Sequence, residues 1–281
     1  MTYIFWFMGA GLLLLALGGE GVIRGGVTSI RALGTAPVIV GLFALSLGTS
    51  SPTLALAVQG SVAGIPEMAL GVVIGATLIN LLLILGLGAL IAPMPSAPKV
   101  VLRDGGAMLL ASGALVLLSL QGGISQRDGV FLVGAFLIYA VIAIVSDWNR
   151  SPEHSVACAE AEKRSMGQRP HFGGGLFALI VGGICLVLGA HFAALGAMAV
   201  AELWRLPVSV VSVTVLALGA SLPVLIVTAI AALRGHTEIA IGHLMTASVF
   251  NLFGALGVAA VVKPLAIPPV FSGVDVFVVL G

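Results

Sequence analysis

Two five-residue stretches, Gly48-Thr-Ser-Ser-Pro52 and Gly219-Ala-Ser-Leu-Pro223, decide the fold, because they lie 171 positions apart in a shared register. The same offset aligns further pairs without a gap: Gly64 with Gly235, Glu67 with Glu238, Gly71 with Gly242, Asn80 with Asn251, and Leu85-Gly86 with Leu256-Gly257. Gly, Leu and Ala are common in this chain, but chance does not place Pro, Glu and Asn in one register. The sequence therefore contains an internal repeat.

The composition around the repeat is that of a membrane protein. Of the 281 residues, 59% are hydrophobic and only 8% are charged, a balance that water-soluble domains of this length do not show. A membrane-spanning helix needs about 20 mostly apolar residues. We predict spans near 2–19, 37–61, 66–92, 104–121, 128–146, 173–200, 207–233 and 237–262, and the start of another near 270. That last run reaches the end of the chain after about 12 residues, too few to cross the bilayer.

Counting spans between the two stretches gives their relative orientation. Five predicted spans separate equivalent points, an odd number, so the second copy must cross the bilayer in the opposite sense. The predicted fold is an all-α polytopic membrane protein with two inverted-topology repeats of about five transmembrane helices, the last helices truncated. Its parts are a first repeat over 1–146, a linker over 147–171 and an incomplete second repeat over 172–281.

The distribution of Lys and Arg predicts the topology. With the N-terminus outside, nine of the twelve lie on the cytoplasmic side, and only Arg127, Arg205 and Lys263 lie outside, as the positive-inside rule favours. The polar segment 147–171 contains Pro152 and Pro170 and is predicted to be a solvated cytoplasmic linker. We expect an integral protein of a bacterial inner membrane.

Both five-residue stretches fall in the middle of a predicted span. Pro removes a backbone donor and Gly and Ser loosen the turn, so each stretch is expected to kink or break its helix. Taken singly, such residues are usually ordinary packing residues of membrane helices. Paired interruptions at equivalent depth in inverted copies are instead typical of secondary transporters, whose sites lie near the midplane.

At these residues the chain resembles the calcium/cation antiporter superfamily, the sodium/calcium exchangers and their relatives. Their two repeats carry Gly-Thr-Ser-x-Pro-Glu followed by Gly-Asn-x-x-Gly-Ser-Asn-x-x-Asn, which match residues 48–53 and 71–80 here, and 219–224 and 242–251 in the second copy. The resemblance covers most of residues 10–265. It implies the exchanger fold, with ion ligands contributed by both repeats.

The family's ion-binding carboxylates are missing from this chain. The Glu that follows Pro in each family motif is Thr53 in the first copy and Val224 in the second. Calcium takes about six to eight oxygen ligands, normally including carboxylates, so tight calcium binding is not expected. The polar residues left to line a pathway are Thr49, Ser50, Ser51, Thr53, Thr77, Asn80, Ser221, His243, Thr246, Ser248 and Asn251. They suit a monovalent ion, water or a neutral solute, and they leave the identity of any metal open.

A few ionisable residues lie in or near the predicted spans. His243 is either a proton site, with an ordinary pKa of about 6.5, or a neutral histidine hydrogen-bonded between helices. Glu20 and Arg24 are expected to form an ion pair four residues apart. Glu67 and Glu238 are expected in the first turn of a helix, where the helix dipole favours an acid.

These patterns leave three functions open. The first is a secondary transporter of the exchanger fold with altered specificity, for a monovalent or proton-coupled cation or another small solute. The second is a structural subunit that kept the fold, lost the ion site and binds a partner membrane protein. The third is a calcium exchanger with unexpected ligands. No enzyme motif occurs, so we expect neither catalysis nor a cofactor, and the expected partners are the lipid bilayer and a small ion or solute, not nucleic acid.

Overall fold

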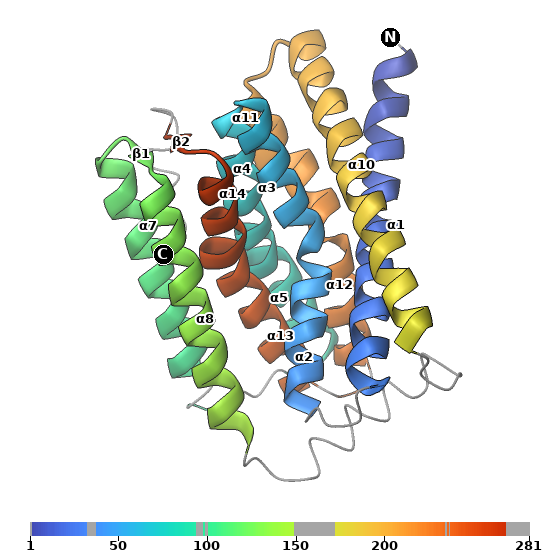
Figure 1. Cartoon of the computed structure of the whole chain (residues 1–281), viewed down its shortest axis with the longest axis vertical. Helices are drawn as coiled ribbons and strands as arrows, with labels where there is room; N and C mark the ends of the chain where they lie inside the picture. Colours follow the sequence, from blue (N-terminus) through green and yellow to red (C-terminus); the bar gives the residue numbers. More distant parts are fainter. Residues whose placement is uncertain are drawn as a thin grey trace.

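The computed structural model describes residues 2–32, 38–93, 98, 101–148, 172–233, 235 and 237–267 as a bundle of helices (Figure 1). In chain order its elements are α1 (Thr2–Ala32), α2 (Val38–Thr49), α3 (Ser51–Ala63), α4 (Pro66–Leu78), the π-helical segment η1 (Ile79–Ile84), α5 (Leu85–Ile91), η2 (Val101–Gly105), α7 (Gly106–Leu120), β1 (Gly123–Ile124), α8 (Gln126–Trp148), α10 (Phe172–Trp204), α11 (Val208–Val211), η3 (Ser212–Leu216), α12 (Ala217–Leu233), α13 (Thr237–Val249), η4 (Phe250–Ala255), α14 (Leu256–Val262) and β2 (Leu265–Ala266). Most of the predicted linker and the run after residue 270 lie outside the described residues.

The element boundaries repeat at the offset found in the sequence. α4, η1 and α5 begin and end 171 residues before α13, η4 and α14. Gly64 and Gly235, which precede the first and second of these triplets, share a left-handed backbone with φ of 73° and 75°. The repeat predicted from sequence is therefore confirmed in the backbone.

The two longest helices, α1 and α10, pack antiparallel along one edge of the bundle (Figure 1). A β-carbon added at Gly11 would lie 2.3 Å from the backbone N of Ala193, and one added at Gly182 would lie 2.7 Å from the backbone N of Val22. These two contacts are equivalent under the offset of 171. Because a helix and its own repeat run in opposite directions, the copies are inverted, as predicted.

The first helix is longer than the sequence indicated. The predicted span ends near residue 19, whereas α1 continues to Ala32. Gly18, Gly21 and Gly25 face α10 and let the two backbones approach along this longer helix. The expected ion pair on this helix is confirmed, since Arg24 Nε lies 2.6 Å from Glu20 Oε1.

The two proline motifs differ in the backbone. In the first copy the interruption is confirmed: α2 ends at Thr49, α3 begins at Ser51, and Pro52 lies in the first turn of α3, where no N–H is needed. In the second copy α12 runs unbroken across Pro223, so the expected break is absent there. The irregularity of this span lies earlier, in the π-helical segment η3, and the surrounding helices of the bundle tolerate the proline.

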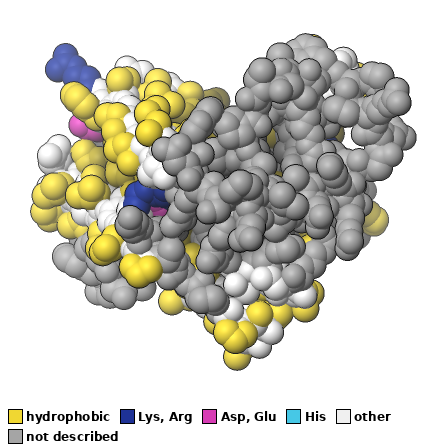
Figure 2. Space-filling model, turned by 90° about the horizontal axis from the view of Figure 1, so that it is seen from below, with side chains coloured by type: hydrophobic (Ala, Val, Ile, Leu, Met, Phe, Trp, Pro, Cys, Tyr) yellow, Lys and Arg dark blue, Asp and Glu magenta, His cyan; other side chains and the backbone are white. Residues whose placement is uncertain are grey.

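The described helices suit a bilayer. Six are long and apolar enough to cross it: Pro66–Ile91, Val101–Leu120, Gln126–Ser146, Gly173–Trp204, Val208–Leu233 and Ala240–Val262. Many large hydrophobic side chains of these helices are exposed on the outside of the bundle, and hydrophobic side chains also dominate the described part of the face in Figure 2. At one end of the bundle, β1 and β2 form a short antiparallel pair between the α7–α8 turn and the chain after α14.

Candidate functional site

The two proline motifs converge on one point of α1. A β-carbon added at Gly19 would lie 3.3 Å from Cγ of Pro52 and 3.7 Å from Cγ of Pro223. Gly19 therefore packs closely against both proline rings. The motifs therefore lie side by side where the repeats meet, next to the α1–α10 pair.

The asparagines of both copies lie in π-helical segments, Asn80 in η1 and Asn251 in η4. Each segment packs against the other repeat: η1 contacts α12 and α13, and η4 contacts α3 and α4. π-helical turns are rare and frequently mark functional sites. Asn80 Nδ2 donates across the repeat interface to Ser248 Oγ at 3.3 Å.

Four of the predicted site residues carry a buried oxygen without a hydrogen-bond partner. They are Ser50 Oγ and Asn80 Oδ1 from the first repeat, and Ser221 Oγ and Asn251 Oδ1 from the second. A buried polar atom left unpaired costs about 1–3 kcal/mol, so such atoms point to a ligand. Among the described residues, only Thr228 Oγ1 on α12 shares this state, and the sequence analysis missed it because it is a single hydroxyl in an apolar run.

The remaining predicted hydroxyls are also buried, but most of them are already engaged. Several donate to a backbone carbonyl one turn earlier on the same helix: Thr49 to Ser46 at 3.0 Å, Ser51 to Gly48 at 2.6 Å, Thr77 to Val73 at 2.9 Å and Ser248 to Leu244 at 2.9 Å. Thr53 is buried on α3. The structure thus separates four oxygens free to bind a ligand from hydroxyls that the helices already use.

His243 is completely buried on α13 and faces α2. Its Nδ1 lies 2.9 Å from Ser46 Oγ, and its Nε2 lies 3.4 Å from Thr49 Oγ1. This geometry fits the neutral histidine hydrogen-bonded between helices, since a neutral ring can donate to one hydroxyl and accept from the other; the proton site stays a prediction. The sequence did not indicate Ser46, because the contact joins residues 197 positions apart.

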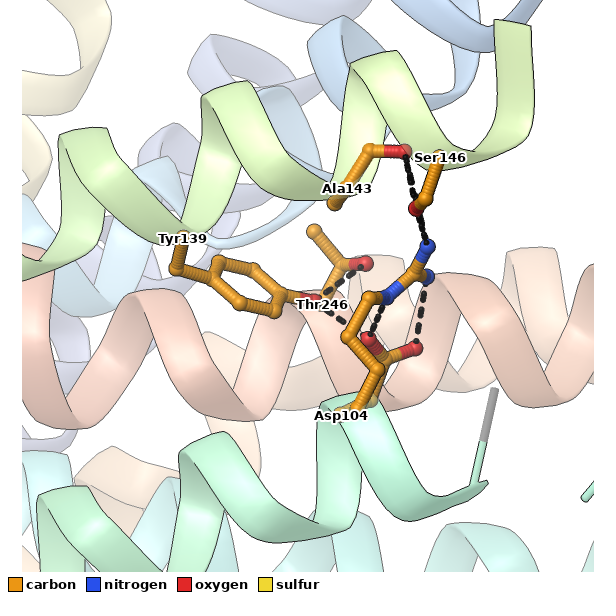
Figure 3. A network of polar contacts seen from close by, with 6 residues as sticks. Asp104, Tyr139, Ala143, Ser146 and Thr246 are labelled. Carbon is orange, nitrogen blue, oxygen red and sulfur yellow. Dashed lines mark hydrogen bonds and ion pairs between the residues drawn. The ribbon is translucent and has the colours of Figure 1, made fainter. Parts of the chain in front are cut away.

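A second polar group, missed by the sequence analysis, surrounds Asp104 (Figure 3). This carboxylate has no exposed surface and forms an ion pair with Arg103, with Nε at 2.6 Å from Oδ1. The hydroxyl of Tyr139 donates to Asp104 Oδ1 at 3.1 Å and lies 3.4 Å from Thr246 Oγ1. The sequence analysis placed Arg103 and Asp104 at the boundary between a loop and a predicted span. The only residue that could have indicated this polar group was Tyr139, a Tyr within an apolar span. Thr246, predicted as a pathway residue, thus faces this group.

Comparison with known proteins agrees with this architecture. The family model described as sodium/calcium exchanger protein matches residues 3–145 and 174–280. The chain belongs to the sodium/calcium exchanger protein family. Its two matched segments flank the predicted linker, and the recognised superfamily and fold class are thereby confirmed.

Proteins with similar sequences include the inner membrane protein YrbG of Escherichia coli, 30% identical over 96% of this chain and 83% of YrbG. The sodium/calcium exchanger MaX1 of Methanosarcina acetivorans is 24% identical over 95% of this chain and 85% of its own length. A solved structure of the sodium-calcium exchanger NCX_Mj, soaked with sodium and strontium, matches with a TM-score of 0.64 at 25% identity, over 100% of this chain and 89% of that one.

At the two positions where the exchanger motif has a glutamate, this chain has an uncharged residue. Thr53 and Val224 are buried in α3 and α12. Within the part of the chain that the structure describes, no cluster of three or more His, Cys, Asp or Glu side chains could hold a metal ion. The four unpaired oxygens are therefore the most ligand-like feature at the repeat interface.

Proposed function

We propose that this chain is a secondary transporter that moves a monovalent cation, most simply sodium, between its two repeats. The observation that carries the proposal is the set of four unpaired buried oxygens: Ser50 and Asn80 from one repeat, Ser221 and Asn251 from the other. A cation bound between the repeats would give oxygens of both the partner that they lack. Alternating exposure then requires only that one repeat move relative to the other.

The neutrality of the four oxygens favours a monovalent ion over calcium. A doubly charged ion requires carboxylates to offset its dehydration in a low-dielectric bundle, and the positions that supply them in the family are Thr53 and Val224 here. A singly charged ion loses less hydration energy and can be held by hydroxyl and amide oxygens. His243, next to Thr49, would give the transporter a group that binds a proton.

Uptake of ²²Na⁺ into proteoliposomes loaded with unlabelled sodium tests the proposal. Asn251→Leu removes one unpaired oxygen and is expected to reduce uptake by about tenfold or more, because one lost ligand of a buried cation costs at least about 1.4 kcal/mol. Ser119→Ala is the matched control, because Ser119 is also buried but its hydroxyl already donates to the Val116 carbonyl within α7. Wild-type protein without uptake would refute the proposal and leave the structural-subunit hypothesis.

The proposal includes the orientation of the chain in the membrane. Nine of twelve basic residues lie on the side predicted to be cytoplasmic, which supports an external N-terminus and an internal linker. In the variant Cys185→Ala, Cys158 of the linker is the single remaining cysteine. We expect a membrane-impermeant maleimide to label Cys158 only after spheroplasts are permeabilised; labelling of intact spheroplasts would reverse the proposed orientation.

A further inference from the structure

Thr228 of α12 is the one described residue outside the four central oxygens whose buried side-chain oxygen has no hydrogen-bond partner. The residue has no exposed surface. Helical Ser and Thr residues often satisfy such a hydroxyl by donating to a carbonyl of the preceding turn, as Thr214 does to Val210 and Ser248 does to Leu244. Thr228 makes no such bond within the described part of the chain, so its own helix does not use this oxygen.

The oxygen of Thr228 also stands outside the symmetry of the repeats. The four central oxygens form two pairs at the offset of 171 residues, for example Ser50 with Ser221. The first-repeat position equivalent to Thr228 is Ala57, a fully buried residue of α3 without a polar side chain. The additional oxygen therefore belongs to one repeat only, and it distinguishes the two ways out of the repeat interface.

Thr228 shares a buried face of α12 with Ser221, one of the four central oxygens. The two residues are seven positions apart on a continuous helix, which is almost two turns and about 10 Å along the axis. Thr228 lies on the Leu233 side of Ser221. The proposed topology makes this end of α12 cytoplasmic.

Helix α12 packs against the first repeat along this length (Figure 1). A β-carbon added at Gly75 of α4 would lie 2.7 Å from Cβ of Ala217, and further along, Ile84 at the end of η1 belongs to one buried cluster with Val224. Helix α12 and the span of α4, η1 and α5 therefore run side by side in the same direction. One turn beyond Val224, Thr228 lies at the level of α5, which α12 also contacts.

A small apolar cluster lies between Ser221 and Thr228 along α12. Val224 packs there with Ile84 of η1 and with two residues of α13, Leu244 and Ala247, apart from the main hydrophobic core. Apolar constrictions of this kind exclude water and ions until the surrounding helices move. A cation that passes such a cluster has lost hydration, so a polar oxygen directly beyond it lowers the cost of passage. Thr228 carries an oxygen one turn past Val224.

We propose that Thr228 is a transit residue of the sodium pathway, an inference that rests on the proposed function. Its hydroxyl oxygen binds the ion after the ion leaves the four central oxygens toward the Leu233 end of α12. This contact speeds passage past Val224 and adds little to the affinity of the central site. The way out past Ala57 in the first repeat lacks this oxygen, so the two directions of exit differ.

Two substitutions separate the hydroxyl of Thr228 from its packing. Thr228→Val removes the hydroxyl and keeps the shape, whereas Thr228→Ser keeps the hydroxyl and removes a methyl group. The maximal rate and half-saturating sodium concentration of ²²Na⁺/Na⁺ exchange are measured in proteoliposomes, and Tm is measured in mild detergent with choline in place of sodium. Thr214→Val is the matched control, because Thr214 lies in the same span, is exposed and already donates to the Val210 carbonyl at 2.6 Å.

The two variants should change exchange and stability in opposite orders. We expect Thr228→Val to lower the maximal exchange rate about tenfold, with the half-saturating sodium concentration within about twofold of wild type. Its Tm should equal or exceed that of wild type, because an unpaired buried hydroxyl has been removed. Thr228→Ser should have a lower Tm, because it leaves a small cavity, but should keep an exchange rate within about twofold of wild type. Thr214→Val should leave exchange unchanged.

The outcomes separate this inference from the proposed function. A wild-type exchange rate in Thr228→Val would overturn the transit role, and so would an equal loss in both variants, since packing and not the hydroxyl would then matter. A higher half-saturating sodium concentration at an unchanged maximal rate would place Thr228 in the ion site itself and would also overturn it. Absence of exchange in wild-type protein would refute the proposed function, and the inference with it.

Discussion

The antiparallel contact of α1 and α10 predicts opposite effects for two glycines that lie two residues apart. A β-carbon at Gly11 would lie 2.3 Å from the backbone N of Ala193 and 2.7 Å from its Cα. Favourable contacts between heavy atoms lie near 3.5–4.0 Å, so in Gly11→Ala the helices must separate by about 1 Å. Such overpacking lowers the free energy of unfolding by about 1–3 kcal/mol. The better helix propensity of Ala offsets about 1 kcal/mol of that loss.

The matched control is Gly9→Ala, where an added β-carbon meets nothing within 4 Å. Thermal unfolding in mild detergent, followed by tryptophan fluorescence, measures both variants. With about 2–4 °C per kcal/mol for a large domain, Gly11→Ala should lower Tm by a few degrees, and Gly9→Ala should leave it unchanged or raise it slightly. Equal Tm values for the two variants would refute the close backbone contact on which the inverted packing is argued.

Three further predictions concern buried charge, the lost carboxylates and backbone strain. Asp104→Asn removes the carboxylate charge that pairs with Arg103 and should destabilise the protein by about 3–5 kcal/mol, whereas the double variant Arg103→Met/Asp104→Leu should restore most of that loss; thermal unfolding decides, and equal losses would contradict the pairing. The double variant Thr53→Glu/Val224→Glu should acquire calcium-dependent stabilisation of about 2.7 kcal/mol at one hundred times its Kd, absent in wild type. Gly64→Ala should cost about 1–2 kcal/mol, because Gly64 has a left-handed backbone with φ of 73°; an unchanged Tm would count against that conformation.

Much of the fold could be predicted because the two halves of the chain share one repeated sequence pattern. The offset of 171 residues defined by Asn80 and Asn251 also relates the observed boundaries of η1 and η4. Where the prediction was wrong, local residue preference was overridden by a contact with a distant helix. Gly25 lies beyond the predicted end of the first span, but α1 continues through it, where the missing side chain admits α10.

The polar contacts of the candidate site were less predictable, since they join distant residues. His243 was recognised as a buried ionisable residue, but its partner Ser46 lies 197 positions away. Asp104 and Tyr139 are 35 positions apart and come from two spans. Which predicted hydroxyls are already bonded, such as Ser51, and which are unpaired, such as Ser50, depends on backbone geometry that the sequence does not specify.

The most direct measurement of the central claim compares two ions in one preparation. Proteoliposomes loaded with unlabelled sodium are divided, and uptake of ²²Na⁺ and of ⁴⁵Ca²⁺ is followed in parallel under the same outward gradient. Transport through four neutral oxygens predicts sodium uptake well above that of protein-free liposomes and calcium uptake at the level of those liposomes. Calcium uptake driven by the sodium gradient at a rate comparable to that of sodium would contradict the account.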